Sequence, residues 1–166
     1  MRQTSTICIA ALNGASAGGG LGLALACDAR VATSQAKMAA SYAGMGLSPD
    51  GGTTWLLPRL VTDQVARRFF LENEIWSAQQ AAELGAIDAI VEETELINCA
   101  KQIALRWSRW GQHSKESIKH LLDVQSTNDF ETHLKHERTL IEASGQTAAF
   151  KEGVSAFLEK REPNFD

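Results

Sequence analysis

The first half of the chain alternates short apolar runs with runs of helical spacing. Continuous apolar residues over 7–12, two of them β-branched, predict a strand buried on both faces. Small and aliphatic residues after the triplet Gly18-Gly19-Gly20 predict a short buried helix that runs through Ala26. Further strands are predicted at 28–33, 37–40 and 87–91.

Helical spacing becomes dominant toward the C-terminus. Helical turns are predicted over 53–57, a helix through Leu71 that Thr62 or Asp63 can cap, and another over 78–84. Ser77 and Gln80 form a capping-box pattern for the last of these, with Gly85 as its stop. Four more helices are predicted at 96–110, 114–124, 130–143 and 147–160. The order indicates an α/β layer over residues 1–92 and a helical region over 93–166.

The composition is typical of a compact domain with a sizeable core. The 166 residues are 44% hydrophobic and 22% charged, with a net charge of −4. The basic residues form no long run, so nothing indicates a nucleic-acid partner. The three cysteines are odd in number and widely spaced, which argues against a disulfide framework and a Cys-x-x-Cys metal site. We therefore expect reduced thiols in a cytosol-like compartment.

An uncharged stretch over residues 3–26 imitates an export signal or a membrane helix. Two of its glycine spacings match the Gly-x-x-x-Gly pattern of membrane-helix dimers. However, Asn13, Ser16 and five glycines interrupt the stretch. A short strand, a Gly-rich turn and a short helix fit it better, so no membrane segment is expected.

The Gly-rich turn is compatible with more than one kind of site. No Gly-Lys-Ser/Thr follows, which excludes a P-loop, and Leu25 stands where a dinucleotide fingerprint has its third glycine. Gly14-Ala-Ser16-Ala-Gly18 matches the nucleophile elbow of serine hydrolases, between a predicted strand and a predicted helix. Alternatively, free N–H groups at the start of the helix could form an oxyanion hole. The residues alone leave these alternatives open.

The four histidines all lie in the predicted helical region and are typical of surface or helix-boundary positions. His133 and His136 are three residues apart and could touch one metal ion on a helix face. No third ligand accompanies them, so we expect no metal site.

One carboxylate stands out at a position with tightly specified backbone geometry. In the stretch GLSPDGGTTWLLPR, Asp50 lies between a proline and a glycine pair, and apolar residues follow closely. Pro-Asp-Gly is ordinary turn chemistry, so these residues alone allow a purely structural role for Asp50.

Four stretches together resemble the enoyl-CoA hydratase/isomerase (crotonase) superfamily. They are IAALNGASAGGGLGLALACDARVA, GMGLSPDGGTTWLLPRLV, SAQQAAELGAIDAIV and FKEGVSAFLEKREPNF, in the family's order and spacing. The resemblance covers essentially the whole chain. It implies a spiral core of short strands and helices, followed by a helical C-terminal region that makes trimer contacts. It also implies a soluble, cytoplasmic homotrimer or dimer of trimers that acts on acyl-CoA thioesters, with coenzyme A as part of the substrate and no metal or redox cofactor.

The resemblance also assigns roles in binding the thioester. Its carbonyl is held by two backbone N–H groups, one of which falls on Gly19 here, with Gly18 and Gly20 beside the substrate. Lys160 matches a family position near the phosphates of coenzyme A. The other N–H group comes from an N-terminal portion of the family that has no counterpart in this chain. We therefore expect unpaired edge strands and a chain that is a poor catalyst by itself, whether it is a truncation, one piece of a split protein or a degenerate member.

The acid/base residues distinguish the activities within the family. Hydratases carry two glutamates, at positions that hold Gly22 and Tyr42 here, so ordinary hydration is not expected. Members that resemble GLxPDxGxTWxLPR use the aspartate as a single acid/base and are isomerases, while aryl-CoA dehalogenases use an aspartate there as nucleophile. We expect Asp50 to be the proton carrier of an enoyl-CoA isomerase, in an apolar pocket where burial makes it a stronger base, and Tyr42 to contact substrate. Alternatives are a hydratase, a dehalogenase, a silent assembly subunit, or a serine hydrolase that uses Ser16.

Overall fold

The computed structural model describes residues 1–165 and divides into two compact units. We call Cys8–Ala104 the core unit, and Met1–Ile7 together with the residues from Leu105 onward the helical unit. The division falls inside a helix, later than residue 92, because the first turns of that helix bury Leu96, Ala100 and Ile103 against the sheet of the core unit. The α/β fold class with a helical C-terminal region is confirmed.

The core unit holds short strands and helices in alternation. Its strands are β1 (Ile9–Leu12), β2 (Ala15–Ala17), β3 (Ala29–Thr33), β4 (Lys37–Ala39), β5 (Ile75–Ser77) and β6 (Ala89–Val91). Its helices are α1 (Gly19–Ala26), α2 (Thr53–Leu56), α3 (Asp63–Leu71), α4 (Ala78–Glu83) and the start of α5 (Leu96–Ser108). Single 3₁₀ turns lie at Ala43–Met45, Leu57–Arg59 and Glu93–Glu95.

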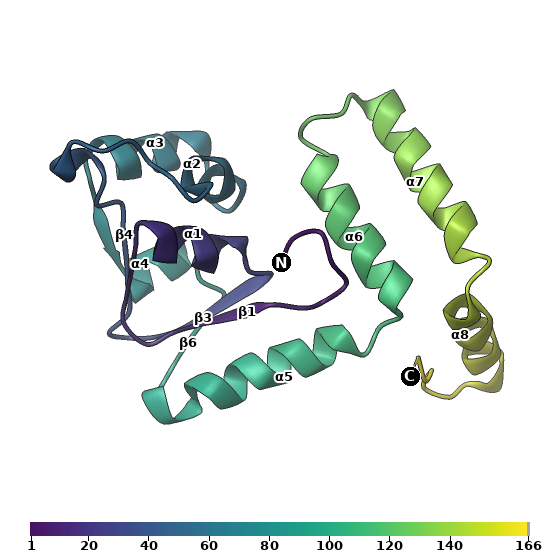
Figure 1. Ribbon diagram of the computed structural model, residues 1–166. Coiled ribbons are helices and arrows are strands. Elements are labelled where there is room, and N and C mark those ends of the chain that lie inside the picture. Colours follow the sequence, from purple (N-terminus) through teal and green to yellow (C-terminus); the bar gives the residue numbers. More distant parts are fainter. Residues whose placement is uncertain (166) are drawn as a thin grey trace. The chain divides into compact units, whose positions relative to one another are not determined.

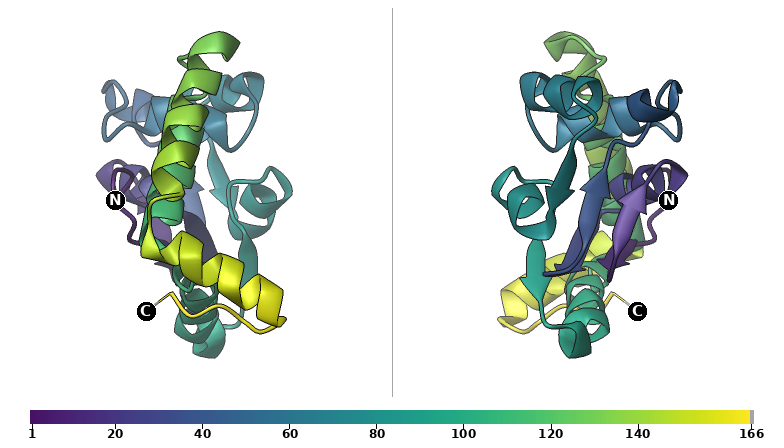
Figure 2. Two further views of the ribbon diagram at one scale, coloured as in Figure 1. Left: turned by 90° about the vertical axis from the view of Figure 1, so that its right-hand side faces the viewer. Right: turned by 90° about the vertical axis from the view of Figure 1, so that its left-hand side faces the viewer.

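The core unit contains two small three-stranded sheets. One has the order β1-β3-β6 and is parallel throughout; the other has the order β2-β4-β5, with β2 and β4 parallel and β4 and β5 antiparallel. Figure 2 shows β1 and β2 (purple) beside β3 and β4 (blue). Both purple strands therefore lie at sheet edges, with a paired neighbour on one side, as the resemblance implied.

The central strand β3 separates two apolar clusters. Ala29 and Val31 pack toward α5, whereas Ala32 packs in the cluster that includes Leu21 and Leu25 of α1. Figure 1 shows the corresponding layers, with α1 and α4 on one side of the strands and α5 on the other. Every residue of β3 is buried, but every residue of β1 is only half-buried. The prediction that the first strand is buried on both faces is wrong, because that strand lies at an edge.

Helix boundaries in the core unit follow the side-chain chemistry of the sequence. The Thr62 hydroxyl accepts a hydrogen bond from the Val65 N–H at 3.3 Å, and the Ser77 hydroxyl accepts one from the Gln80 N–H at 3.2 Å. Gly85 has a φ of +87° after α4. The predicted cap at Thr62, the Ser77 half of the capping box and the stop at Gly85 are confirmed.

The helical unit contains α6 (Gln112–Val124), α7 (Phe130–Ser144) and α8 (Ala148–Glu159), within a few residues of their predicted bounds. The Asp129 side chain caps α7 and the Thr147 side chain caps α8. No helix among residues 1–165 is both long enough and apolar enough to cross a membrane.

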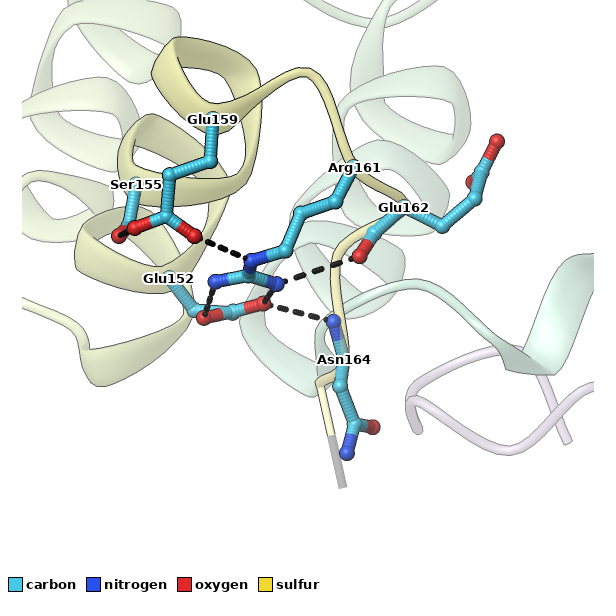
Figure 3. Close-up of polar contacts among 6 residues, drawn as sticks. All are labelled: Glu152, Ser155, Glu159, Arg161, Glu162 and Asn164. Carbon is cyan, nitrogen blue, oxygen red and sulfur yellow. Dashed lines mark hydrogen bonds and ion pairs between the residues drawn. The ribbon is translucent and has the colours of Figure 1, made fainter.

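Arg161 ties the C-terminal tail to α8 in the helical unit (Figure 3). Its guanidinium donates to both carboxylate oxygens of Glu152, at 2.6 and 3.0 Å, and to Glu159 at 2.7 Å. Glu152 also accepts the Asn164 N–H at 2.8 Å. The hydrogen bonds from Arg161 and Asn164 lower the pKa of Glu152 from 4.5 to about 2. The chain therefore turns back along α8 after Lys160, which caps that helix with a φ of +55°.

Candidate active site

The N-terminus of α1 presents unpaired backbone donors. Gly18 precedes the helix with φ +52° and ψ −131°, a conformation that needs a glycine. The first backbone hydrogen bond of the helix runs from the Gly22 N–H to the Gly18 carbonyl at 3.2 Å. The N–H groups of Gly19, Gly20 and Leu21 therefore precede the helical ladder, and both glycines are exposed. A side chain at Gly18, Gly19 or Gly20 would point into open space, so an incoming group could approach this turn closely.

The loop that contains Asp50 has a defined backbone. Gly51 and Gly52 follow it with φ of +58° and +75°, two consecutive left-handed conformations. The Asp50 carbonyl accepts hydrogen bonds from the Thr53 N–H at 3.1 Å and the Thr53 hydroxyl at 2.9 Å. Thr53 is fully buried and begins α2, so the loop is anchored to the core immediately after the carboxylate.

The Asp50 loop and the start of α1 are in direct contact. A Cβ atom at Gly22 would lie 2.5 Å from the Gly51 carbonyl oxygen, a separation that the two backbones could not tolerate. A Cβ atom at Gly51 would lie 3.6 Å from the Cα atoms of both Gly19 and Gly22. The residue after Asp50 therefore rests on the first turn of α1, beside the free N–H groups. The structure thus brings together the predicted site residues of the core unit.

Tyr42 contacts the Asp50 carboxylate. Its hydroxyl donates to the Asp50 Oδ1 atom at 2.9 Å, while its ring is buried. Asp50 itself is exposed, as are Gly44–Leu47 before it and Gly51–Gly52 after it. The prediction that Asp50 is buried in an apolar pocket is therefore wrong for the described residues. The hydrogen bond to Tyr42 was missed, since eight positions separate the two residues and no local pattern joins them.

The other candidates have different surroundings. Ser16 is buried in the middle of β2, where it pairs with Met38. A nucleophile elbow requires an exposed serine on a sharp turn, so that interpretation is wrong. Lys160 is exposed at the end of α8 in the helical unit, and its role toward coenzyme A stays a prediction. No cluster of three or more metal-binding side chains occurs in the described part of the chain.

Known proteins match nearly the whole chain. The sequence profile of the enoyl-CoA hydratase/isomerase family matches residues 1–166. The chain is 38% identical over 157 residues to 1,2-epoxyphenylacetyl-CoA isomerase of Escherichia coli (strain K12), covering 95% of this chain and 60% of the relative. It is 35% identical over 157 residues to crotonyl-CoA hydratase of Syntrophomonas wolfei, with the same coverage. The chain therefore spans about 60% of the length of these curated relatives.

Solved structures give the same picture. An enoyl-CoA hydratase from Polaromonas sp. JS666 superposes with a TM-score of 0.90 at 35% identity, covering 98% of this chain and 63% of that chain. DspI of Pseudomonas aeruginosa superposes with a TM-score of 0.92 at 37% identity, covering 99% and 63%. Sequence and fold agree: the chain belongs to the enoyl-CoA hydratase/isomerase (crotonase) family.

Proposed function

We propose that this chain carries the catalytic carboxylate of an enoyl-CoA isomerase, with an acyl-CoA thioester as substrate and Asp50 as the proton carrier. The observation that supports the proposal most is the contact between the Asp50 loop and the first turn of α1. It sets the residue that follows the Asp50 carboxylate against the helix turn whose backbone donors are suited to a thioester oxygen.

Each proposed step uses groups of this site. The Gly19 N–H donates a hydrogen bond to the thioester carbonyl oxygen, and the partial positive charge of the α1 N-terminus stabilises the charge that develops there. Asp50 takes a proton from a carbon conjugated to the carbonyl, and the electron pair of that C–H bond becomes part of a dienolate. The protonated Asp50 then returns the proton to a different carbon, so the double bond moves while the composition stays the same. These steps call on no metal or redox cofactor.

Hydration on the same scaffold is the second candidate, because matched relatives include proteins named as hydratases. The geometry around Gly22 argues against it. A glutamate at this position would need a Cβ atom 2.5 Å from the Gly51 oxygen, so the present loop leaves no room for a second acid there. At the second position where hydratases of the family carry a glutamate, this chain has Tyr42, which supplies a hydroxyl instead of a carboxylate.

Asp50→Asn tests the proposal, since asparagine is an equally good turn residue and an amide is no base near neutral pH. The variant is assayed by absorbance against a panel of enoyl-CoA thioesters, in the 166-residue chain and in the chain extended at its N-terminus with the preceding segment of a full-length relative. We expect isomerisation in the extended form to fall about 10²–10⁴-fold while acyl-CoA binding is retained.

The matched control is Asp63→Asn, which changes an exposed aspartate in the first turn of α3. It should leave isomerisation unchanged. Full activity of Asp50→Asn would instead assign Asp50 a turn role. Loss of activity in Ser16→Ala, together with labelling of the wild type by a fluorophosphonate, would favour a serine hydrolase.

The proposal also covers the unextended chain. The unextended chain supplies one of the two N–H donors that the oxyanion hole has in the crotonase family. Loss of one such donor lowers kcat about 10²–10³-fold. We expect the extension to raise turnover by a factor of that size. Ordinary enzyme rates from the 166-residue chain by itself would contradict this part of the proposal.

A further inference from the structure

The Tyr42 ring that carries the hydrogen bond to Asp50 is buried and packed against other aromatic rings. The Tyr42 ring is 5% exposed, and its centroid lies 6.4 Å from that of Phe70. Phe70 in turn makes an edge contact with Phe69 at 5.2 Å, and Phe69 packs on Trp76 at 4.2 Å. The hydroxyl is therefore fixed by a chain of aromatic contacts that reaches into the core, whereas the carboxylate it contacts is exposed.

Other hydrogen bonds fix the backbone at Tyr42 and at Asp50, independently of the bond between their side chains. The Tyr42 carbonyl accepts the N–H groups of Met45 and Leu47, each at 3.0 Å. The Asp50 carbonyl accepts the N–H and the hydroxyl of Thr53. Removal of the Tyr42 hydroxyl would leave these anchors in place, so its specific effect is on the orientation of the carboxylate.

Within residues 1–165 the structure gives the Asp50 carboxylate no second side-chain donor. An exposed aspartate without such a bond samples several rotamers, because its two side-chain torsions meet few contacts. The bond to Oδ1 selects one of them and leaves the Oδ2 atom available to a proton on substrate.

We propose that Tyr42 is a positioning residue for proton transfer: its buried hydroxyl fixes Oδ1 of Asp50 so that Oδ2 takes and returns the substrate proton. This inference rests on the proposed function of Asp50. It replaces the expectation from the resemblance that Tyr42 contacts substrate. In the step itself, the Oδ2–H bond forms as the substrate C–H bond breaks, and the reverse occurs at the second carbon.

Tyr42→Phe in the extended chain tests this role, because it removes the hydroxyl and keeps the ring. We expect kcat for isomerisation to fall about ten- to a hundredfold, since a misplaced catalytic group costs up to about 10²-fold. KM and the melting temperature should stay close to those of the wild type. In the Asp50→Asn background, Tyr42→Phe should cause no further loss, because the hydroxyl then has no catalytic carboxylate to orient.

A second measurement detects the hydrogen bond between Tyr42 and Asp50 directly and needs no activity assay. Tyr42 is the sole tyrosine of the sequence, so ¹³Cζ-labelled tyrosine gives a single ring-carbon NMR signal. We expect that signal to move in Asp50→Asn and to stay in place in the control Asp63→Asn.

The outcomes separate the two proposals. Wild-type activity of Asp50→Asn would overturn the proposed function. An inactive Asp50→Asn combined with wild-type kcat in Tyr42→Phe would overturn the positioning role alone. A tyrosine NMR signal that does not move in Asp50→Asn would also overturn the positioning role. A Tyr42→Phe variant with raised KM and unchanged kcat would overturn it too, because that result assigns Tyr42 to substrate binding.

Discussion

The core unit and the helical unit bury their apolar side chains to very different degrees. In the core unit the large residues Leu21, Val31, Phe69 and Trp76 are completely inaccessible to solvent. In the helical unit the buried side chains of α6–α8 are small, Ser117 and Ala156. Large apolar side chains of these helices are instead exposed, among them Phe130, Ile141, Phe150, Phe157 and Leu158.

The difference shows that similar amphipathic sequences serve two purposes. An apolar stripe on a short helix such as α3 is covered by the core unit itself. The helical unit does not itself cover the stripes on α6–α8, and exposed apolar surface of this extent is typical of protein interfaces. We therefore expect the core unit to determine the stability of the single chain and the helical unit to determine its association.

The largest expected effect is on the free energy of unfolding. Phe69→Ala should lower it by about 3–5 kcal/mol, because the ring is fully buried and leaves a cavity between Phe70 and Trp76. The matched control, Phe157→Ala, removes a ring that is 82% exposed and should change the value by less than about 0.5 kcal/mol in dilute monomer. Chemical denaturation at low protein concentration measures both. Equal losses would remove the distinction between the units.

The next effect concerns association. We expect the chain to form a trimer or a pair of trimers through the helical unit. Phe157→Glu should then weaken assembly by about 2 kcal/mol or more, as aromatic residues at interface centres do. Sedimentation at micromolar concentration measures the mass of each form. A stable wild-type monomer under these conditions would contradict the prediction.

A smaller effect is expected where the Asp50 loop meets α1. Gly22→Ala should lower the free energy of unfolding by about 1–3 kcal/mol, because the new methyl group meets the Gly51 carbonyl at 2.5 Å. Gly20→Ala is the matched control, since its methyl group enters open space in the same helix. It should be neutral or stabilising by up to about 1 kcal/mol. Thermal or chemical unfolding that ranks the two variants in the opposite order would show that the loop is not held against α1.

The smallest effect is a pH dependence at the end of α8. The pKa of Glu152 lies at about 2 in the folded chain, below its ordinary value of 4.5. Its ion pair with Arg161 therefore stabilises the tail at pH above about 4.5, and this stabilisation is lost as the pH falls toward 2. Hydrogen exchange of the Asn164 amide, which donates to Glu152, should accelerate over that range relative to remote amides. Glu152→Gln should abolish the excess acceleration.

Features encoded by neighbouring residues could be predicted from the sequence. The caps at Thr62 and Ser77 depend on a hydroxyl three residues before a backbone N–H, and the stop at Gly85 depends on one glycine. The long helices α5–α8 were likewise predicted to within a few residues of their ends, because each repeats an apolar period over several turns.

Features that depend on distant residues could not be predicted. The strands β2 and β5 were not predicted, and both are defined by their pairing with β4. Whether β1 is central or at an edge depends on its neighbours, which its own apolar run does not specify. Exposure of Asp50 follows in the same way from what packs around its loop.

The contact between Gly22 and Gly51 also restricts the order in which this site can change during evolution. A glutamate codon at position 22 would be selected against in the present background, because the side chain meets the Gly51 carbonyl before it could contribute a carboxylate. The loop after Asp50 must first move away from α1, and that movement disturbs the existing carboxylate. A lineage that passes from one acid to two therefore either passes through a form in which Asp50 is displaced, or changes both segments together.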